Sequence, residues 1–233
     1  MKKYLQYVVI MALIVFLLFQ NINTEGPAGI PLGNSALASQ IPKQSSVLND
    51  IVLLPEEKFE EEEVMRMINR LSALPINLLE SIRKEEIQVR LFQESLTDFP
   101  SAAHLKGVIP RGYKSNITWD EVPGIGGSKL VLVKIGHSNP GQGHGSVNLE
   151  LHELAHSIHR YLLDDLLVEI TLQELMEKES GLLFHNREYF LHYKEEFFAE
   201  SFAMFYLNSS TNKTLYERAP KTHAFFLQLE QLY

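Results

Sequence analysis

Apolar residues recur along much of the chain at intervals of three and four, the spacing of helices that bury one face. Such stretches predict helices over residues 55–73, 75–84, 148–161, 162–178, 194–207 and 220–232. The first should begin at Pro55, because proline suits the first turn and Glu56 and Glu57 suit its positive end. Two shorter apolar runs, 87–92 and 129–135, have the character of strands. The pattern predicts an α+β fold, mostly helical, with a small sheet before the helix at 148.

The first 44 residues have a different pattern from the rest of the chain. Lys2 and Lys3 precede an apolar run at 7–19, which has the length of a signal-peptide core and falls short of the ~20 residues of a membrane span. An uncleaved signal anchor, which would tether the protein to the membrane, is the alternative, since the small-residue pattern Ala36-Leu37-Ala38 lies far beyond the run. Both readings place the folded part outside the cytoplasm, either secreted or membrane-anchored.

Residues 21–44 are rich in Gly, Pro, Ser and Asn and have no hydrophobic period, which predicts a flexible linker with little order. We therefore divide the chain into a signal and linker at 1–40 and one folded domain at 45–233. Within that domain we expect a helical lobe at about 45–105 and a catalytic part at about 106–233.

The composition limits which partners and which metal ligands the protein can have. The 29 acidic residues outnumber the 21 basic ones, for a net charge of −8, and no basic stripe follows a predicted helix, so nucleic acid is not an expected partner. The chain has no cysteine, which excludes disulfides, thiol nucleophiles and thiolate metal sites. Histidine and carboxylate side chains would have to hold any metal ion.

The helix predicted at 148–161 contains the sequence His152-Glu153-Leu154-Ala155-His156. Two histidines four residues apart lie on one helix face, where both imidazoles can bind the same zinc ion. Glu153 then lies beside the metal, where its carboxylate can activate the water that attacks a peptide bond. This HExxH motif predicts a zinc metallopeptidase with one zinc ion per chain.

A second acidic helix can complete the site. Glu196 and Glu200 are one turn apart at 194–207, while Phe197, Phe198 and Phe202 supply a buried side. One of these acids can be the third zinc ligand and the other can orient an imidazole from behind. The alternative is an amphipathic helix whose acids are merely solvated.

Several further stretches carry a family resemblance. They are Thr118-Trp119-Asp120-Glu121-Val122-Pro123-Gly124, Ser138-Asn139-Pro140-Gly141, Gly143-His144-Gly145-Ser146, residues 152–156, Glu196-Phe197-Phe198-Ala199-Glu200 and Ala219-Pro220-Lys221-Thr222. Together they resemble the secreted clostridial and bacillary Pro-Pro endopeptidases, and they are similar to the catalytic domain of anthrax lethal factor. The resemblance implies a gluzincin-like metallopeptidase domain with a helical N-terminal lobe.

The resemblance also implies roles for single residues. Glu196 would be the third zinc ligand, Glu200 the acid behind the first shell of ligands, and Tyr189 the donor to the oxyanion of the intermediate. Spacing alone does not choose Tyr189 over Tyr193.

The implied substrate is an extended, proline-rich peptide with proline on both sides of the cleaved bond. Trp119 is a candidate platform for those prolines, Gly126 and Gly127 a candidate edge for the peptide, and His144 a candidate contact from its glycine-rich loop. The alternatives are a Trp in the core or at its rim, and glycines of ordinary turns.

Three functions compete at this point. The first is an exported, monomeric endopeptidase that cuts secreted or cell-surface proteins at Pro-Pro sites. The second is a lethal-factor-like toxin protease with a narrow host substrate, and the third is a toxin-type binding module without catalysis. The intact set of His152, Glu153, His156 and Glu196 favours an enzyme.

Overall fold

A computed structural model describes residues 29–112, 116–185 and 187–232. The apolar run at 7–19 lies outside these residues. No helix in the described part of the chain is both long enough and apolar enough to cross a membrane.

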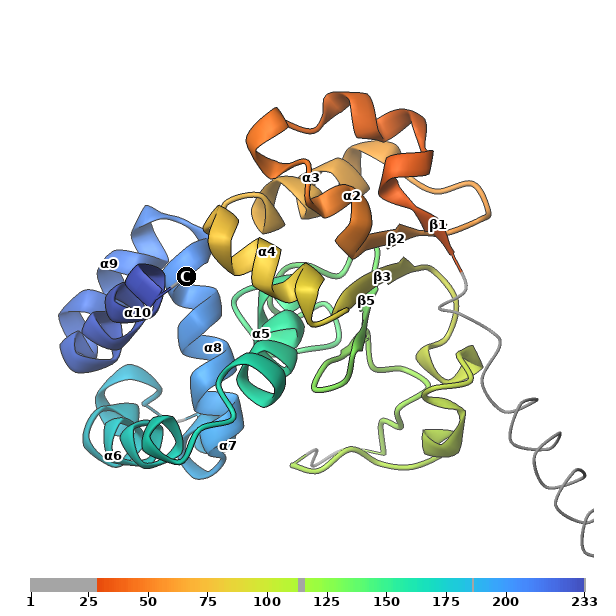
Figure 1. Cartoon of the computed structure of the whole chain (residues 1–233). Helices are drawn as coiled ribbons and strands as arrows, with labels where there is room; N and C mark the ends of the chain where they lie inside the picture. Colours follow the sequence, from red (N-terminus) through yellow and green to blue (C-terminus); the bar gives the residue numbers. More distant parts are fainter. Residues whose placement is uncertain (1–28, 113–115, 186, 233) are drawn as a thin grey trace, which may run out of the picture.

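A small mixed sheet lies at one side of the molecule (Figure 1). Its order is β1 (Ile30–Pro31), β2 (Val52–Leu54), β3 (Gln88–Phe92), β5 (Leu130–Lys134) and β4 (Gly124–Ile125). The three central strands are parallel, with Val89 opposite Val131. Both edge strands, β1 and β4, pair antiparallel to their neighbours, so β4 forms one free edge of the sheet.

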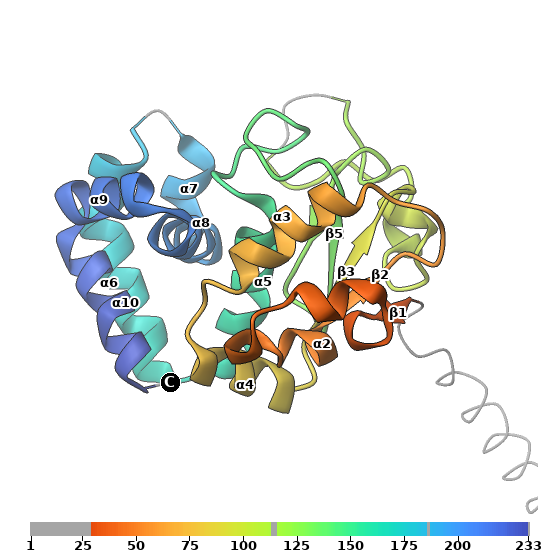
Figure 2. The same cartoon turned by 90° about the horizontal axis from the view of Figure 1, so that it is seen from above.

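Helices make up most of the described chain. The N-terminal ones are α2 (Leu48–Ile51), α3 (Glu61–Leu71) and α4 (Ile76–Lys84), together with the 3-10 turns η1 (Leu32–Asn34), η2 (Ala36–Gln40) and η3 (Lys43–Ser45). The later ones are α5 (Leu149–Leu162), α6 (Leu166–Leu183), α7 (Glu188–His192), α8 (Lys194–Leu207), α9 (Ser209–Arg218) and α10 (Pro220–Leu232). In both views α5 lies between the sheet and the group formed by α6 to α10 (Figures 1 and 2). Its most extensive helix contact is with α8.

The two faces of the sheet bury different clusters. Val89 and Leu91 of β3 belong to the main core, which also contains the buried sides of α5 and α8. On the opposite face Phe92 packs in a smaller cluster with Leu96, Phe99, Ala102 and Leu132. The turns η4 (Leu96–Asp98) and η5 (Ala103–Leu105) supply part of this smaller cluster, and Trp119 packs against it.

The predicted fold class is confirmed, since the chain is mostly helical with a small mixed sheet. The predicted helices at 194–207 and 220–232 match α8 and α10, and the two predicted strands match β3 and β5 within one residue at each end. The helix predicted from Pro55 begins instead at Glu61. Val52–Leu54 form a buried strand and Pro55 continues out of it, so the acidic first turn is that of Glu61, Glu62 and Glu63.

The expectation of little order before residue 45 is wrong from Gly29 onwards. Residues 30–45 form β1 and three 3-10 turns, and Leu32 and Leu37 are 0% and 3% exposed. Each buried side chain belongs to a separate short turn, so the apolar residues show no helical or strand period. Gly, Pro and Ser here shape tight turns on the core rather than a free linker.

Candidate metal centre

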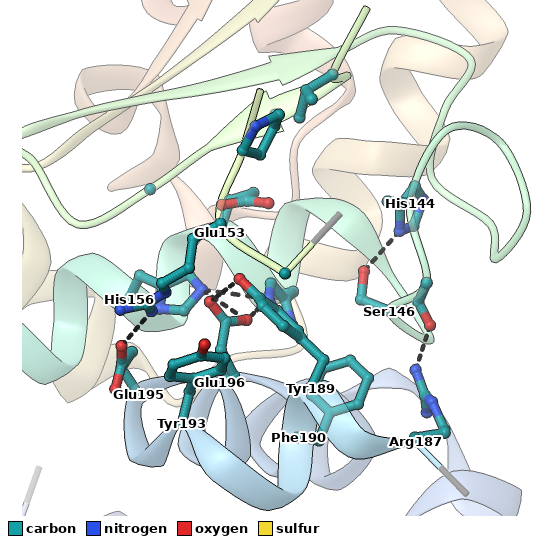
Figure 3. A pocket seen from close by; sticks show the side chains of 18 of the residues that line it. His144, Ser146, Glu153, His156, Arg187, Tyr189, Phe190, Tyr193, Glu195 and Glu196 are labelled. Carbon is teal, nitrogen blue, oxygen red and sulfur yellow. Dashed lines mark hydrogen bonds and ion pairs between the residues drawn. The ribbon is translucent and has the colours of Figure 1, made fainter. Parts of the chain in front are cut away.

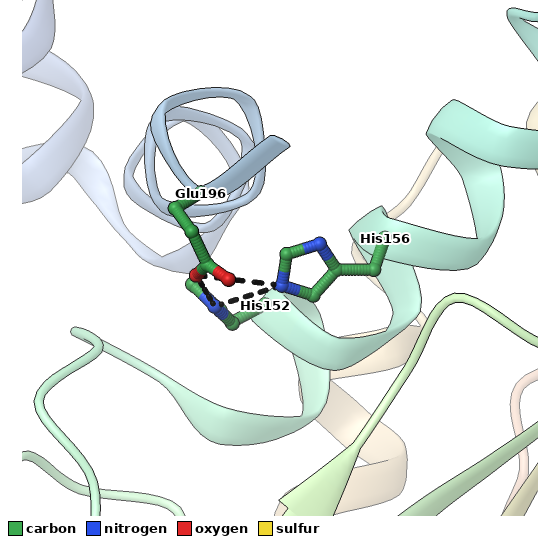
Figure 4. Close-up of side chains that lie close together, drawn as sticks. All are labelled: His152, His156 and Glu196. Atoms are coloured by element: carbon green, nitrogen blue, oxygen red, sulfur yellow. Dashed lines mark hydrogen bonds and ion pairs between the residues drawn. The ribbon is translucent and has the colours of Figure 1, made fainter. Parts of the chain in front are cut away.

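Helix α5 presents the HExxH residues because its start and its buried side are well specified. Asn148 caps the helix, with its side-chain oxygen accepting a hydrogen bond of 3.0 Å from the Leu151 backbone. Leu151, Leu154 and Ile158 are fully or almost fully buried in the main core. The histidines at 152 and 156 then share the side of α5 that faces α8 (Figure 4).

His152, His156 and Glu196 form a group that could hold a metal ion. One ligand atom from each lies within 4.8 Å of the others. The Nε2 atom of His152 lies 3.2 Å from Nε2 of His156 and 3.2 Å from a Glu196 oxygen, and Nε2 of His156 lies 3.6 Å from that oxygen. Two ring nitrogens that face each other need a proton or a cation between them. Two imidazole nitrogens and one carboxylate oxygen are a donor set that zinc accepts.

The charges of this group suit a cation. Burial alone would lower the pKa of His152, but its hydrogen bonds to Glu196 and Glu200 raise that pKa to about 10. Burial would likewise raise the pKa of Glu196, yet His152 and His156 hold it below its usual range. Glu196 therefore stays ionised. The negative charge of Glu196 and Glu200 favours a positive charge beside them, either a proton bound to His152 or a metal ion.

Glu200 contacts the same imidazole from the other side. It is fully buried, and one of its oxygens lies 3.2 Å from Nδ1 of His152. The Val147 backbone donates to the Glu200 carboxylate at 3.1 Å, and Arg187 donates to it at 2.9 Å. These contacts fix the carboxylate, which in turn orients the ring so that Nε2 points at His156 and Glu196.

Arg187 is a residue that sequence reasoning did not single out. Besides Glu200, it binds the Gly145 carbonyl oxygen, and its guanidinium lies over the Phe190 ring, 4.1 Å from the ring centre. No short motif marks an arginine in this loop. Its acidic partner Glu200 was the one available signal.

Glu153 lies beside the ligand group and lines the same cleft as His152 and His156 (Figure 3). Burial raises the pKa of its carboxyl group, and the nearby His152 and His156 oppose that rise. The glycines of the β4 segment pack closely on this residue: a side chain at Gly126 would meet the Glu153 carbonyl oxygen at 1.9 Å. Gly126 therefore brings backbone against α5 next to Glu153.

The structure brings Tyr189, rather than Tyr193, to a ligand carboxylate. The Tyr189 hydroxyl donates a hydrogen bond of 2.7 Å to Glu196 (Figure 3). Burial, followed by the charge of Glu196, raises the pKa of this phenol, so it keeps its proton. Tyr193 lies beside Tyr189, with ring centres 5.3 Å apart, and stacks under Arg111.

These residues lie in an open cleft of about 1740 Å³. The candidate substrate residues Trp119, Gly126, Gly127 and His144 all line it. Both ring nitrogens of His144 have partners within its own loop, Ser146 at 2.6 Å and the His137 carbonyl at 2.7 Å. His144 therefore forms part of the cleft wall and is held there by contacts within its own loop.

His159 also lines the cleft but is not part of the ligand group. Its ring stacks on Phe198, with centres 5.0 Å apart, and its Nε2 lies 2.6 Å from Glu169. These contacts give His159 a packing role beside the ligand group.

Comparisons with known proteins give a consistent result. The chain matches the family model described as anthrax toxin lethal factor, N- and C-terminal domain, over residues 40–229. It is 38% identical to a Pro-Pro endopeptidase of Clostridioides difficile (strain 630) over 203 residues, which are 87% of this chain and 91% of that protein. It is 32% identical to a Pro-Pro endopeptidase of Paenibacillus alvei over 188 residues, which are 80% of this chain and 86% of that protein. The solved structure of the Paenibacillus alvei Pro-Pro endopeptidase matches with a TM-score of 0.74 at 32% identity, covering 79% of this chain and all of that one.

Proposed function

Because the chain belongs to the anthrax toxin lethal factor family, we propose that it is a zinc-dependent endopeptidase that cuts proteins at Pro-Pro sites. The observation that carries this proposal is the convergence of His152, His156 and Glu196 on one point of the cleft, with Glu153 beside them. The relatives named Pro-Pro endopeptidases support the reaction and the proline-rich substrate.

His152, His156 and Glu196 would hold the zinc ion. Bound there, zinc would act as a Lewis acid and would lower the pKa of a water molecule. Glu200 keeps the His152 ring in place through Nδ1, with Arg187 and the Val147 backbone fixing the Glu200 carboxylate.

Glu153 is the general base of the proposed reaction. Its carboxylate takes a proton from water as the water oxygen bonds to the carbonyl carbon of the substrate. The same proton then passes to the leaving nitrogen as the carbon–nitrogen bond breaks. Tyr189, whose phenol keeps its proton, donates a hydrogen bond to the carbonyl oxygen while that oxygen carries negative charge.

The cleft offers places for an extended peptide. The free edge of the sheet is β4, and residues 124–127 line the cleft next to Glu153, so a substrate strand can add to this edge. Trp119 would supply a flat apolar surface for proline rings. Gly127 continues the edge, and His144 lies in the wall formed by the glycine-rich loop.

The other two functions fit this chain less well. A non-catalytic binding module has no need of a complete ligand group with a general base beside it. A toxin-type protease with a narrow host substrate would use the same site, so the cleaved sequence separates it from the proposed enzyme.

We further propose that the protein is exported and acts as a monomer on secreted or cell-surface proteins. Lys2, Lys3 and the apolar run at 7–19 support export by a signal peptide, or tethering by an uncleaved anchor. Fractionation of the producing cells, with sequencing of the mature N-terminus, would separate these two outcomes.

The test of the activity uses the full chain and a library of quenched fluorescent peptides with varied residues around a central Pro-Pro. We expect cutting between the prolines that a zinc chelator abolishes and added zinc restores. Cutting that persists without metal would contradict the mechanism. Metal binding with no cutting of any peptide would favour the binding module or a narrower protease.

A further inference from the structure

Asp120, next to the cleft residue Trp119, is held by an unusually complete set of neutral donors. Its Oδ1 accepts a hydrogen bond of 2.6 Å from the Thr97 hydroxyl. Its Oδ2 accepts bonds of 2.7 Å from the Gly107 backbone and 2.9 Å from the Thr118 hydroxyl. These three bonds hold the pKa of Asp120 down, at about 2, so the carboxylate is ionised at neutral pH.

The donors come from three separate segments of the chain. Thr97 belongs to η4 and Gly107 follows η5. Thr118 starts the turn that carries Trp119, since its carbonyl oxygen accepts a bond of 3.0 Å from the Glu121 backbone. The Ser95 hydroxyl adds a bond of 2.8 Å to the Asp120 carbonyl oxygen. Asp120 is thus the point at which the smaller hydrophobic cluster and the Trp119 turn are joined.

Trp119 lies between that cluster and the cleft. Its side chain packs against the cluster of Phe92, Leu96 and Phe99, and it also lines the cleft. Its backbone is tied to Val108 by a bond of 2.9 Å. The indole is only partly buried, so its position depends on the turn that bears it as well as on packing.

We propose that Asp120 is a positioning residue for substrate binding: it fixes the Trp119 turn to η4 and η5 so that the indole forms a rigid wall of the cleft. Asp120 is not among the residues that line the cleft, so it acts through Trp119. The consequence for catalysis rests on the proposed peptidase function, whereas the consequence for the position of Trp119 does not.

The test compares Asp120→Asn with Glu121→Gln in the full chain. Each variant removes one negative charge at nearly constant size, and Glu121 is the exposed neighbour. The chain has one tryptophan, so its fluorescence reports on residue 119 alone. In Asp120→Asn we expect red-shifted emission and stronger quenching by acrylamide, with Glu121→Gln unchanged.

Kinetics give the second measurement. In Asp120→Asn we expect KM for a Pro-Pro peptide to rise roughly tenfold while kcat changes less than about twofold, because binding is affected and the reacting groups are not. Thr97→Val and Thr118→Val, which each remove one donor, should give smaller changes of the same kind. They also keep the test open if Asp120→Asn folds poorly.

Unchanged fluorescence and unchanged KM in folded Asp120→Asn would overturn the proposal. A fall in kcat at constant KM would overturn it as well, because that result means only a smaller active fraction. If the wild type cuts no Pro-Pro peptide, the proposed function fails, and the fluorescence of the variants still decides whether Asp120 positions Trp119.

Discussion

The two buried carboxylates of α8 differ in their contacts, because they lie against different nitrogen atoms of one imidazole. Glu196 faces Nε2 of His152, and Glu200 faces Nδ1 of the same ring. An imidazole that binds a metal through Nε2 needs an acceptor for its Nδ1 proton. Burial of Glu200 is tolerable because Arg187 and the Val147 backbone donate to it.

The separate roles proposed for Glu153 and Glu196 predict that zinc binding and turnover can be lost independently. Glu196→Ala removes a ligand atom and should lose bound zinc. Glu153→Ala leaves all three ligand atoms, so it should keep zinc and lose roughly 10²–10⁴-fold in kcat, the range of general acid–base catalysis. Metal content per chain and peptide cleavage, measured on the same samples, check both. Normal activity in Glu153→Ala would show that the base has been assigned wrongly.

Tyr189 can be tested against its neighbour. Tyr189→Phe removes the hydroxyl that donates to Glu196 and that we assign to the oxyanion. We expect kcat to fall about 10²–10³-fold, the effect of losing one such donor, with zinc retained. Tyr193→Phe is the matched control and should stay close to wild type. Equal losses in the two variants would count against a specific role for Tyr189.

For single residues, the sequence predicted which side chains belong to the site better than which residues they contact. The HExxH spacing predicted that His152 and His156 share one helix face, and the structure brings them together, because helix geometry fixes which side chains share a face. The spacing of Glu196 and Glu200 offered two acids and no order between them, since the order depends on how α8 packs on α5. Arg187 was missed because its partners, Glu200 and the Gly145 carbonyl, are far away in the sequence.

Among the elements, α5 is held by polar as well as apolar contacts. Arg70 of α3 binds Glu150 of α5 at 2.5 Å and the Ser138 hydroxyl at 3.1 Å. Glu150 is 0% exposed, so Arg70 is the cation that makes a buried charge tolerable there. This pair joins the N-terminal helices to the helix that carries the histidines.

Removing Arg70 should therefore be costly. Arg70→Ala leaves the Glu150 charge buried and unpaired, and we expect a loss of roughly 3–5 kcal/mol in the free energy of unfolding. Arg66→Ala is the control on the same helix. Its side chain is 55% exposed and pairs with Glu63 and Glu62, so the loss should stay under about 1 kcal/mol. Urea unfolding measures both, and similar losses would contradict the role given to the buried pair.

The low pKa of Asp120 predicts how its contribution to the stability of the protein depends on pH. The folded value, about 2, lies below the ordinary value of 3.8, so the ionised group stabilises the fold above its unfolded pKa. That contribution is lost as pH falls through the folded pKa. The gap in melting temperature between wild type and Asp120→Asn should be full above about pH 5 and should shrink towards pH 2. A gap that does not change with pH would contradict this.

Whether an element could be predicted depended on its apolar period. Helices α8 and α10 bury a regular face and were predicted at their true bounds. Helix α9 was missed because Ser209–Arg218 is almost wholly polar and buries only Leu215. The helix expected from Pro55 began late because β2 is too short to show a period, so the strand before it was not recognised.

For the molecule as a whole, the folded part starts before the match to the family model does. The family match begins at residue 40, inside a segment that packs on the core from β1 onwards. Ile30 pairs with Leu54 in the sheet, and Leu32, Leu37 and Ile41 are 0%, 3% and 9% exposed. These residues extend the core, although they lack a periodic pattern.

Removal of residues 1–44 should therefore destabilise the protein, whereas removal of residues 1–28 keeps every one of these contacts. Burying a Leu or Ile side chain contributes about 1.5–3 kcal/mol, so losing three costs roughly 5 kcal/mol or more. That is comparable with the total stability of an ordinary domain, about 5–15 kcal/mol. Urea unfolding of the two shortened chains beside the full chain measures the difference. Leu37→Ala in the full chain should show part of the same loss, about 2–5 kcal/mol. Equal stability of the two shortened chains would mean that residues 29–44 only cover the core and do not support it.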